Sequence, residues 1–247
     1  MVTTAADVQT ALAEVADPQD AVFLQRFFKT GPGQYGEGDV FVGVRVPQVR
    51  AVAKKFAGLP LDQLDILLDS DVHEHRLAAL IMLNSLFAAA SRTASRNDDR
   101  RGEIADFYLA AVRRGRVNNW DLVDSSAEFV LGEFLYDRPR DLIFELAASP
   151  TLWERRVAVL STFAFIKRGD ASSTLQVARQ LVADREDLMQ KAVGWMLREV
   201  GKRVDRALLL EFLDANAARM PRTMLSYATE HLTPEERVAY RNRPRTD

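Results

Sequence analysis

The stretch HEHRLAAL at residues 73–80 has a counterpart in WERRVAVL at residues 153–160. In both stretches, charged residues are followed by apolar residues that recur with the three- and four-residue spacing of one helix face. A looser copy, MQKAVGW, occupies residues 189–195, so the three copies start 80 and 36 positions apart. Repetition of a helix at such intervals predicts a chain built from stacked helical hairpins.

The rest of the chain favours the same architecture, because apolar residues follow helical spacing almost throughout and no stretch alternates as a strand does. Two helices per unit of roughly 35–45 residues are typical of HEAT-like arrays. We therefore predict an all-α fold, a HEAT-like repeat α-solenoid of antiparallel helical hairpins in an α-α superhelix. Residues 1–247 are expected to form a single domain. An irregular helical bundle is the alternative, since the copies match only loosely.

Turn signals separate the expected helices. Asp, Ser or Thr directly before Pro is a helix-start arrangement, with a capping residue followed by Pro at the first helical position. The polar stretch from Ala90 to Arg101 is expected to be an exposed loop. The other turn signals are Asp17-Pro18, Gly31-Pro32-Gly33, Leu59-Pro60, Pro139, Ser149-Pro150, Met220-Pro221 and Thr233-Pro234.

Composition narrows the classes of protein. The chain has no cysteine, which excludes disulfides, thiolate metal sites and cysteine nucleophiles. No window approaches the roughly 20 uninterrupted apolar residues of a membrane span, and no secretory signal is recognisable. Of only three histidines, His73 and His75 diverge on a helix, which argues against a zinc hydrolase. We expect a cytoplasmic protein of bacterial type, a monomer without metal, cofactor or membrane attachment.

The first candidate site is the stretch from Asn118 to Asp124. Asn119 is suited to cap a helix on which Trp120 and Asp124, four positions apart, share a face. An indole beside a carboxylate suits a cationic ligand, because the ring face and the negative charge both attract positive charge. The alternative is a core tryptophan with a carboxylate that the helix dipole favours.

Two further candidates are arginine-bearing helices. Arg155 and Arg156 near a helix start are suited to bind phosphate, although one of them is equally able to pair with Glu154 or Glu128. Trp195 and Arg198 share a face in a helix that includes Lys191. Small residues at Ala192 and Gly194 permit close approach of another helix or of a ligand backbone, and a core tryptophan is the alternative.

The fourth candidate is the glycine-rich stretch at residues 33–47, with Tyr35 in it and Arg45 and Arg50 in or after it. Such a loop suggests phosphate binding, but no Gly-Lys-Ser/Thr element follows, which excludes a P-loop. An ordinary loop between two helices is the alternative.

Four phrases together resemble the AlkD-type DNA alkylation-repair glycosylases, a HEAT-like repeat family. They are FVGVRVPQVR at residues 41–50, WDLVD at 120–124, LWERR at 152–156 and QKAVGWMLRE at 190–199, in the order of the family. The resemblance implies double-stranded DNA as the partner and excision of N3- or N7-alkylated purines. It implies that Asp124 is the catalytic carboxylate, that Trp120 and Trp195 contact the lesion and its backbone, and that Arg156 binds phosphate. Arg198 and Tyr35 match the family less closely.

The net charge of −2 and the pI of about 6.0 are unusual for a DNA-binding protein. We therefore expect a bipolar molecule with a basic concave face, and an acidic excess elsewhere, at Asp62, Asp65, Asp69, Asp71 and the Asp98-Asp99 loop. Two alternatives stay open: a non-catalytic binder of distorted or branched DNA, and a protein–protein scaffold. The expected basic residues are Arg45, Arg50, Lys54, Arg155, Arg156, Lys191, Arg198, Lys202 and Arg222.

Overall fold

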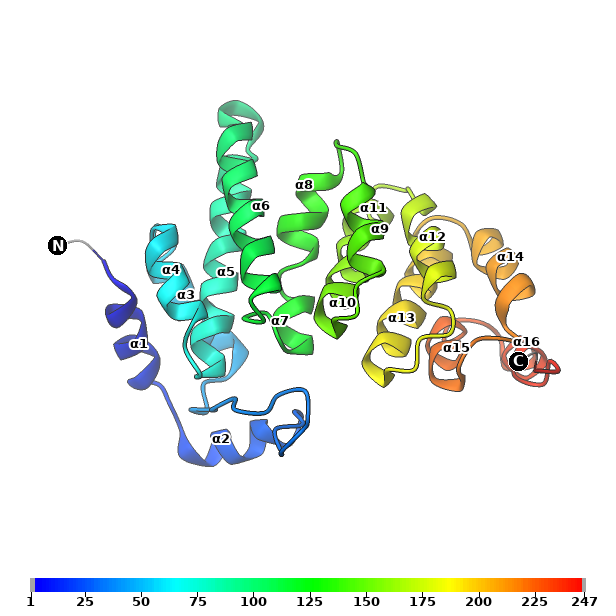
Figure 1. Ribbon diagram of the computed structural model, residues 1–247, viewed down its shortest axis with the longest axis horizontal. Helices are drawn as coiled ribbons and strands as arrows, with labels where there is room; N and C mark the ends of the chain where they lie inside the picture. The colour runs from blue at the N-terminus through cyan, green and yellow to red at the C-terminus, as the bar shows by residue number, and fades with distance from the viewer. Residues whose placement is uncertain (1–2, 246–247) are drawn as a thin grey trace. The chain divides into compact units, whose positions relative to one another are not determined.

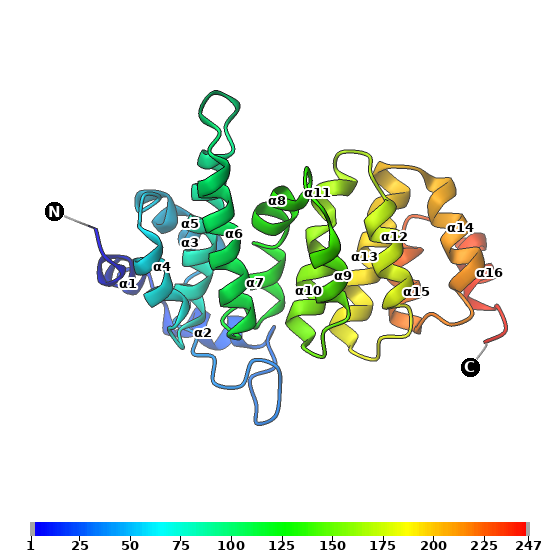
Figure 2. The same cartoon turned by 45° about the horizontal axis from the view of Figure 1, so that its top comes forward.

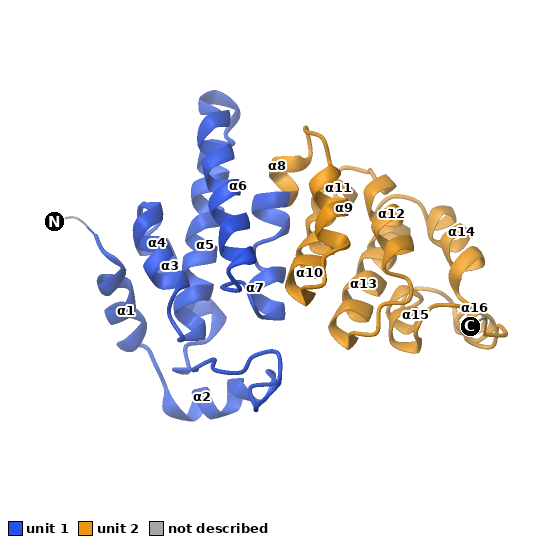
Figure 3. Cartoon of the chain, in the orientation of Figure 1, with its two compact units in different colours: residues 1–131 blue, residues 132–247 orange. Residues whose placement is uncertain are grey.

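The computed structural model describes residues 3–245, and the regular secondary structure in this range is helical apart from one isolated parallel bridge between Val40 and Val72. The prediction of an all-α fold is confirmed. The chain divides into two compact units, residues 1–131 and residues 132–247 (Figure 3). None of the helices in the described range is long and apolar enough to cross a membrane.

Unit 1 is organised around its longest helix, α5. This helix packs against α3, α4, α6 and α7, and α4 also contacts α6 (Figure 1). The segment that contains α2 and the glycine-rich loop lies beside the lower ends of α3, α5 and α7 in Figures 1 and 2. The helices of this unit are α1 (Ala5–Ala13), α2 (Pro18–Gln25), α3 (Val46–Lys55), α4 (Leu61–Leu68), α5 (His73–Ala90), α6 (Asp98–Arg113) and α7 (Trp120–Asp124).

Unit 2 contains two rows of helices. In one row α10 packs against α13 and α13 against α15, and in the other α9 contacts α12. Consecutive helices α9 and α10, and likewise α12 and α13, pair across the rows, as stacked hairpins require. The helices are α8 (Glu133–Leu135), α9 (Asp141–Ala147), α10 (Leu152–Ser161), α11 (Phe163–Ile166), α12 (Ser172–Gln180), α13 (Asp187–Arg203), α14 (Arg206–Asn216), α15 (Arg222–Ala228) and α16 (Pro234–Arg241).

The three sequence copies all fall on helices that pack at the centre of their unit, namely α5, α10 and α13. A π-helical segment, η2 (Glu128–Gly132), follows α7 and contains the division between the units. The turn signals also mark helix starts. Asp17 caps α2 by accepting the N–H of Gln19 at 2.8 Å, and Thr233 accepts the N–H of Glu236 at the start of α16.

The expected loop from Ala90 to Arg101 is shorter than predicted. Ala90 ends α5, a 3₁₀ turn η1 occupies Thr93–Ser95, and α6 already begins at Asp98. The side chain of Asn97 caps this helix by accepting the N–H of Arg100 at 2.9 Å. Asp98 and Asp99 therefore lie in a first helical turn, where the helix dipole favours negative charge, and not in a loop.

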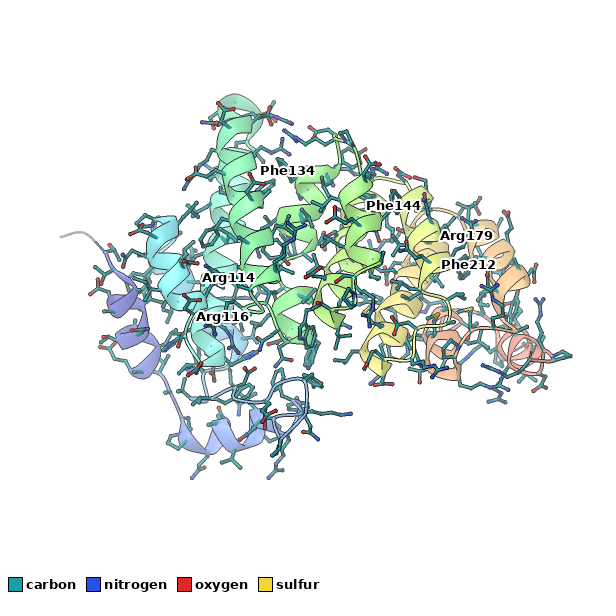
Figure 4. The ribbon with its side chains drawn as sticks, viewed as in Figure 1. Arg114, Arg116, Phe134, Phe144, Arg179 and Phe212 are labelled. Atoms are coloured by element: carbon teal, nitrogen blue, oxygen red, sulfur yellow. The ribbon has the colours of Figure 1, made fainter. Side chains whose placement is uncertain are left out.

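The acidic excess expected around residues 62–71 is partly neutralised. Arg114 and Arg116, labelled in Figure 4, follow the end of α6. A guanidinium nitrogen of Arg114 lies 2.5 Å from Asp65 of α4, and Nε of Arg116 lies 3.0 Å from Asp69. These exposed pairs are each worth about 0–1 kcal/mol. They remove part of the charge contrast on which the expectation of a bipolar molecule depended.

Gly194 explains how closely two helices of unit 2 approach. A Cβ atom at this position would lie 2.5 Å from the carbonyl oxygen of Met224 and 2.6 Å from Cβ of Tyr227. Both neighbours belong to α15, which packs on α13. From sequence, the small residues of this helix are expected to permit close approach of another helix or of a ligand backbone. At Gly194 the close neighbour is another helix.

Candidate functional site

The short helix α7 begins as its sequence predicts. The side-chain oxygen of Asn119 accepts the N–H of Trp120 at 2.9 Å, and the fully buried Asn119 also donates from Nδ2 to Asp39 at 3.1 Å. Trp120 and Asp124 are the first and last residues of the helix, one turn apart. Both side chains are half-buried. An indole and a carboxylate therefore share one partly accessible helix face.

The negative charge of Asp124 affects the pKa of a buried phenol, Tyr108. Tyr108 of α6 is fully buried, and its hydroxyl is 3.0 Å from Oγ of Ser126, which in turn donates to the carbonyl oxygen of Leu122. Burial raises the pKa of Tyr108, the hydrogen bond with Ser126 lowers it, and the negative charge of Asp124 raises it further. The phenol therefore stays neutral, and it braces the helix that presents Asp124.

A charged cluster lies beside α7, centred on His73 at the first turn of α5. Its Nε2 is 2.8 Å from Oδ2 of Asp121 in α7, and its Nδ1 is 3.5 Å from Oδ2 of Asp39. Arg76 completes the cluster with Nη2 2.6 Å from Oδ1 of Asp39. The side chains of His73, Arg76 and Asp39 are each at most 3% exposed. A buried network of this kind fixes geometry, because each charge depends on its partners.

The protonation states of this cluster follow from its charges. Burial disfavours the imidazolium, but the charge and hydrogen bond of Asp121, with a contribution from Asp39, raise the pKa of His73 to about 9. Burial similarly disfavours ionised Asp39, but contact with His73 and the charge of Arg76 hold its pKa below the ordinary value. At neutral pH, His73 is thus a cation between two carboxylates.

Aromatic rings connect the cluster to Trp120. The ring of Phe28 stacks on Trp120, with centroids 5.4 Å apart and planes inclined by 16°, and it also stacks on Phe41 at 4.8 Å. His73 lies 4.8 Å from Phe41 and 5.0 Å from Phe28. Phe28 therefore covers one face of the Trp120 indole. Any ligand that stacks on Trp120 does so on the opposite face or at the ring edge.

A carboxylate of α5 binds three consecutive backbone N–H groups of the loop after α2. Oε1 of the buried Glu74 accepts the backbone N–H groups of Val42, Gly43 and Val44 at 3.1, 2.8 and 3.2 Å. Gly43 has a φ of +83°, and a Cβ there would lie 1.9 Å from the carbonyl oxygen of Asp17. The glycine is thus required both by conformation and by space.

The other candidates of unit 1 lie around this loop. Tyr35 is half-buried within the turn between positions 31 and 39. Arg45 precedes α3, and its guanidinium binds Asp20 of α2 through two bonds of 2.6 and 2.7 Å. Arg50 is exposed on α3, and no ion pair to it occurs among residues 3–245. Of the two arginines, Arg45 is thus paired with a carboxylate, and Arg50 presents an exposed cation without an ion pair among the described residues.

In unit 2, the paired arginines of α10 make contacts within the fold. Nε of Arg155 lies 2.9 Å from Asp184, and its Nη1 donates to the carbonyl oxygens of Ser149 and Pro150. Arg156 is buried and donates to the carbonyl oxygen of Leu188 at the start of α13. Arg155 therefore forms an internal ion pair, as one alternative from sequence allowed, but with Asp184 as the partner.

Trp195, Arg198 and Lys191 are all on α13. Glu199, buried on the same helix, accepts from the indole N–H of Trp195 at 3.3 Å and from Arg198 at 3.1 Å. Arg198 also binds Glu230. Lys191 pairs with Asp187 at 2.8 Å. Burial opposes ionisation of Glu199, but hydrogen bonds from Arg203 and Arg198 hold its pKa below the ordinary value, so it stays anionic.

The structure thus brings Trp120 and Asp124 together on α7 of unit 1, and Trp195 and Arg198 together on α13 of unit 2. Sequence reasoning missed Asp121 within α7 and three residues beside this helix: Phe28, Asp39 and His73. Asp121 was within the quoted WDLVD phrase, and His73 opens the quoted helix copy. The fold and these sites define an all-α protein that presents an aromatic ring and a carboxylate on a short, firmly capped helix.

Comparison with known proteins identifies the family. Residues 8–232 match the family described as DNA alkylation repair enzyme, and the chain belongs to that family. Among solved structures, it is similar to a predicted DNA alkylation repair enzyme from Enterococcus faecalis, with 16% sequence identity and a TM-score of 0.66. The match covers 89% of this chain and 97% of the other. The comparison with curated proteins found no match.

Proposed function

We propose that this protein is a DNA glycosylase that hydrolyses the N-glycosidic bond of cationic N3- or N7-alkylated purines in double-stranded DNA. The observation that carries the proposal is the pair on α7, where the half-buried Asp124 lies one turn from the half-buried Trp120. A carboxylate beside an aromatic face complements a substrate whose positive charge moves from the base to the sugar as the bond lengthens.

The proposed reaction needs no strong general acid. An N3- or N7-alkylated purine is already positively charged and leaves without further protonation. Asp124 would stabilise the oxocarbenium-like sugar by its charge and orient the attacking water. Trp120 would contact the cationic lesion or its sugar, at about 0.5–2 kcal/mol for a face contact.

The surroundings of α7 support this role because they hold in place the helix that presents the two side chains. Asn119 caps the helix, Phe28 stacks on one indole face, and His73 binds Asp121 rather than Asp124. A fixed carboxylate needs no reorganisation as charge develops, which is the source of electrostatic catalysis. In unit 2, taken by itself, we propose that Trp195 makes an aromatic contact with DNA and that Arg198 binds a phosphate, whereas the burial of Arg156 favours a structural role.

Base release from methylated duplex DNA tests the proposal. The wild-type protein is incubated with DNA that contains 3-methyladenine and 7-methylguanine, and the released bases are separated by chromatography. Asp124→Asn, which keeps the shape of the side chain, is expected to release base at least about 100-fold more slowly while still binding DNA. Asp106→Asn on the exposed side of α6 is the matched control and is expected to retain the wild-type rate.

Two results would contradict the proposal. Absence of released base from the wild-type protein, together with tight binding to distorted or branched duplexes, would favour a non-catalytic DNA binder. Equal release by wild type and Asp124→Asn would remove Asp124 from the mechanism. The third possibility, a protein–protein scaffold, predicts no salt-sensitive affinity for DNA.

A further inference from the structure

A cavity of about 410 Å³ lies between α15 and α16, remote in sequence from α7 and from the quoted part of α13. Its volume is within the range of roughly 300–1,000 Å³ that is usual for small-ligand sites. One wall comes from α15 and the residue that ends it. The residues of this wall are Arg222, Leu225, Ser226 and Thr229.

The second wall comes from α16 and consists of Pro234, Arg237, Val238 and Arg241. The spacing of the lining residues is the same on both helices, with steps of three, one and three positions. Residues with this spacing share one face of a helix. Two whole helix faces are therefore turned toward the cavity, and each face combines arginine with apolar residues.

The charge of the lining is entirely positive. Arg222, Arg237 and Arg241 line the cavity, and none of its lining residues is acidic. Within residues 3–245, none of these three arginines forms an ion pair with a carboxylate. Three glutamates flank the lining residues in sequence: Glu230 binds Arg198, Glu236 binds Arg206, and among the described residues Glu235 forms no ion pair with a lining arginine. The positive charge of the lining is thus not neutralised by an ion pair within the described residues.

The arginines of this arrangement repel one another, and a bound anion would relieve the repulsion. Arg237 and Arg241 are four positions apart on one helix, where like charges repel. Arg222 donates a hydrogen bond to the carbonyl oxygen of Arg241, so the guanidinium of Arg222 is fixed across the gap between α15 and α16. Guanidinium groups bind phosphate oxygens in bidentate fashion and stay charged, which makes phosphate the anion that best matches three of them.

The uncharged part of the lining indicates an organic portion of the ligand. Leu225 is buried at 4% exposure, and Pro234 and Val238 add apolar surface. Ser226 offers an exposed hydroxyl, and Thr229, whose hydroxyl donates to the carbonyl oxygen of Leu225, offers an acceptor. We propose that this cavity, the α15–α16 pocket, binds the phosphate of a nucleotide, with its sugar and base against the apolar wall.

Calorimetric titration of the full chain with deoxyadenosine monophosphate tests the proposal. The double variant Arg237→Gln/Arg241→Gln is expected to bind the nucleotide at least tenfold more weakly than wild type. The control Arg179→Gln/Arg185→Gln removes two exposed arginines of the same unit that do not line the cavity, and it is expected to stay within twofold of wild type. Adenosine, which has no phosphate, is expected to bind wild type at least tenfold more weakly than the monophosphate.

A second measurement does not depend on any variant. In methyl NMR spectra of wild type, the resonances of Leu225 and Val238 are expected to shift on titration. If duplex DNA displaces the nucleotide, the pocket binds a phosphate of a DNA strand. If duplex DNA does not displace it, the pocket binds a free mononucleotide. Both outcomes support the proposal. Equal affinity of wild type and the pocket variant, or unshifted methyl resonances, would overturn it. Asp124→Asn should bind the nucleotide like wild type, so this test is independent of base excision.

Discussion

His73 of α5 and Asp121 of α7 form a hydrogen-bonded ion pair, with Nε2 and Oδ2 2.8 Å apart, across 48 positions of sequence. Asp39 and Arg76 complete the surroundings of the imidazole. This pair ties the helix that presents Trp120 and Asp124 to the longest helix of unit 1. Its stability therefore bears on the geometry of the proposed active site.

The pair predicts a dependence of stability on alkaline pH. The pKa of His73 is raised from 6.5 to about 9 on folding, because the carboxylate of Asp121 outweighs the effect of burial. A group whose pKa is raised on folding stabilises the fold while it is protonated. The contribution of His73 is therefore complete below about pH 6.5 and is lost as pH rises through about 9. The free energy of unfolding, measured with urea at pH 6.5 and pH 9.5, should fall by roughly 3 kcal/mol from this group.

The variant His73→Gln provides the comparison. It cannot be protonated, so the difference in stability between wild type and variant is expected to shrink across the same pH interval. His75→Gln is the matched control, since burial lowers the pKa of His75 and its titration falls below this interval. A constant difference between wild type and His73→Gln from pH 6.5 to 9.5 would show that His73 is neutral in the fold.

The loop that contains Gly43 is expected to tolerate no side chain at that position. In Gly43→Ala the new Cβ would meet the carbonyl oxygen of Asp17 at 1.9 Å, and φ would be unfavourable at +83°. We expect a loss of about 3 kcal/mol or more in the free energy of unfolding, from strain and from disturbed bonds to Glu74. Gly58→Ala, where a Cβ meets open space, should change stability by less than about 1 kcal/mol. Similar unfolding midpoints for both variants would contradict this account.

Close packing of α13 and α15 gives a parallel prediction for unit 2. Gly194→Ala would place a methyl group 2.5 Å from a backbone oxygen of α15, which cannot move aside as a flexible side chain can. Overpacking of this kind costs about 1–3 kcal/mol, which thermal unfolding would detect. Gly102→Ala in α6 faces open space and should be neutral or stabilising by up to about 1 kcal/mol. A stable Gly194→Ala protein would mean that the two helices can separate without cost.

Local features were predictable from sequence because their causes are local. Asn119 caps α7 through its own side chain, and the small Gly194 in an apolar helix run indicated close packing. Both depend on residues within one turn or on volume alone. The helix start at Asp98 was misjudged because a polar first turn has the composition of a loop, and only the cap by Asn97 distinguishes the two.

The cluster around His73 was not predictable, because its members come from three separate segments. Asp39, His73 and Asp121 meet only once α5, α7 and the glycine-rich loop are in place. A histidine with polar neighbours in sequence gives no sign that two distant carboxylates will surround it. Phe28 was missed for a similar reason, since it follows α2, a helix without buried residues whose apolar pattern indicates no core face.

The stacking of Phe28 on Trp120 predicts a specific effect on base release. In Phe28→Ala the indole loses its partner at 5.4 Å and gains freedom to rotate, so it is less often in the orientation that contacts the lesion. Aromatic pairs are worth about 0.5–1.5 kcal/mol, which corresponds to a rate roughly 2- to 10-fold lower. Phe27→Ala is the control, because Phe27 is 58% exposed and its ring contacts Phe23. Single-turnover release of 3-methyladenine measures both variants, and equal losses would show that Phe28 acts on stability alone rather than on Trp120.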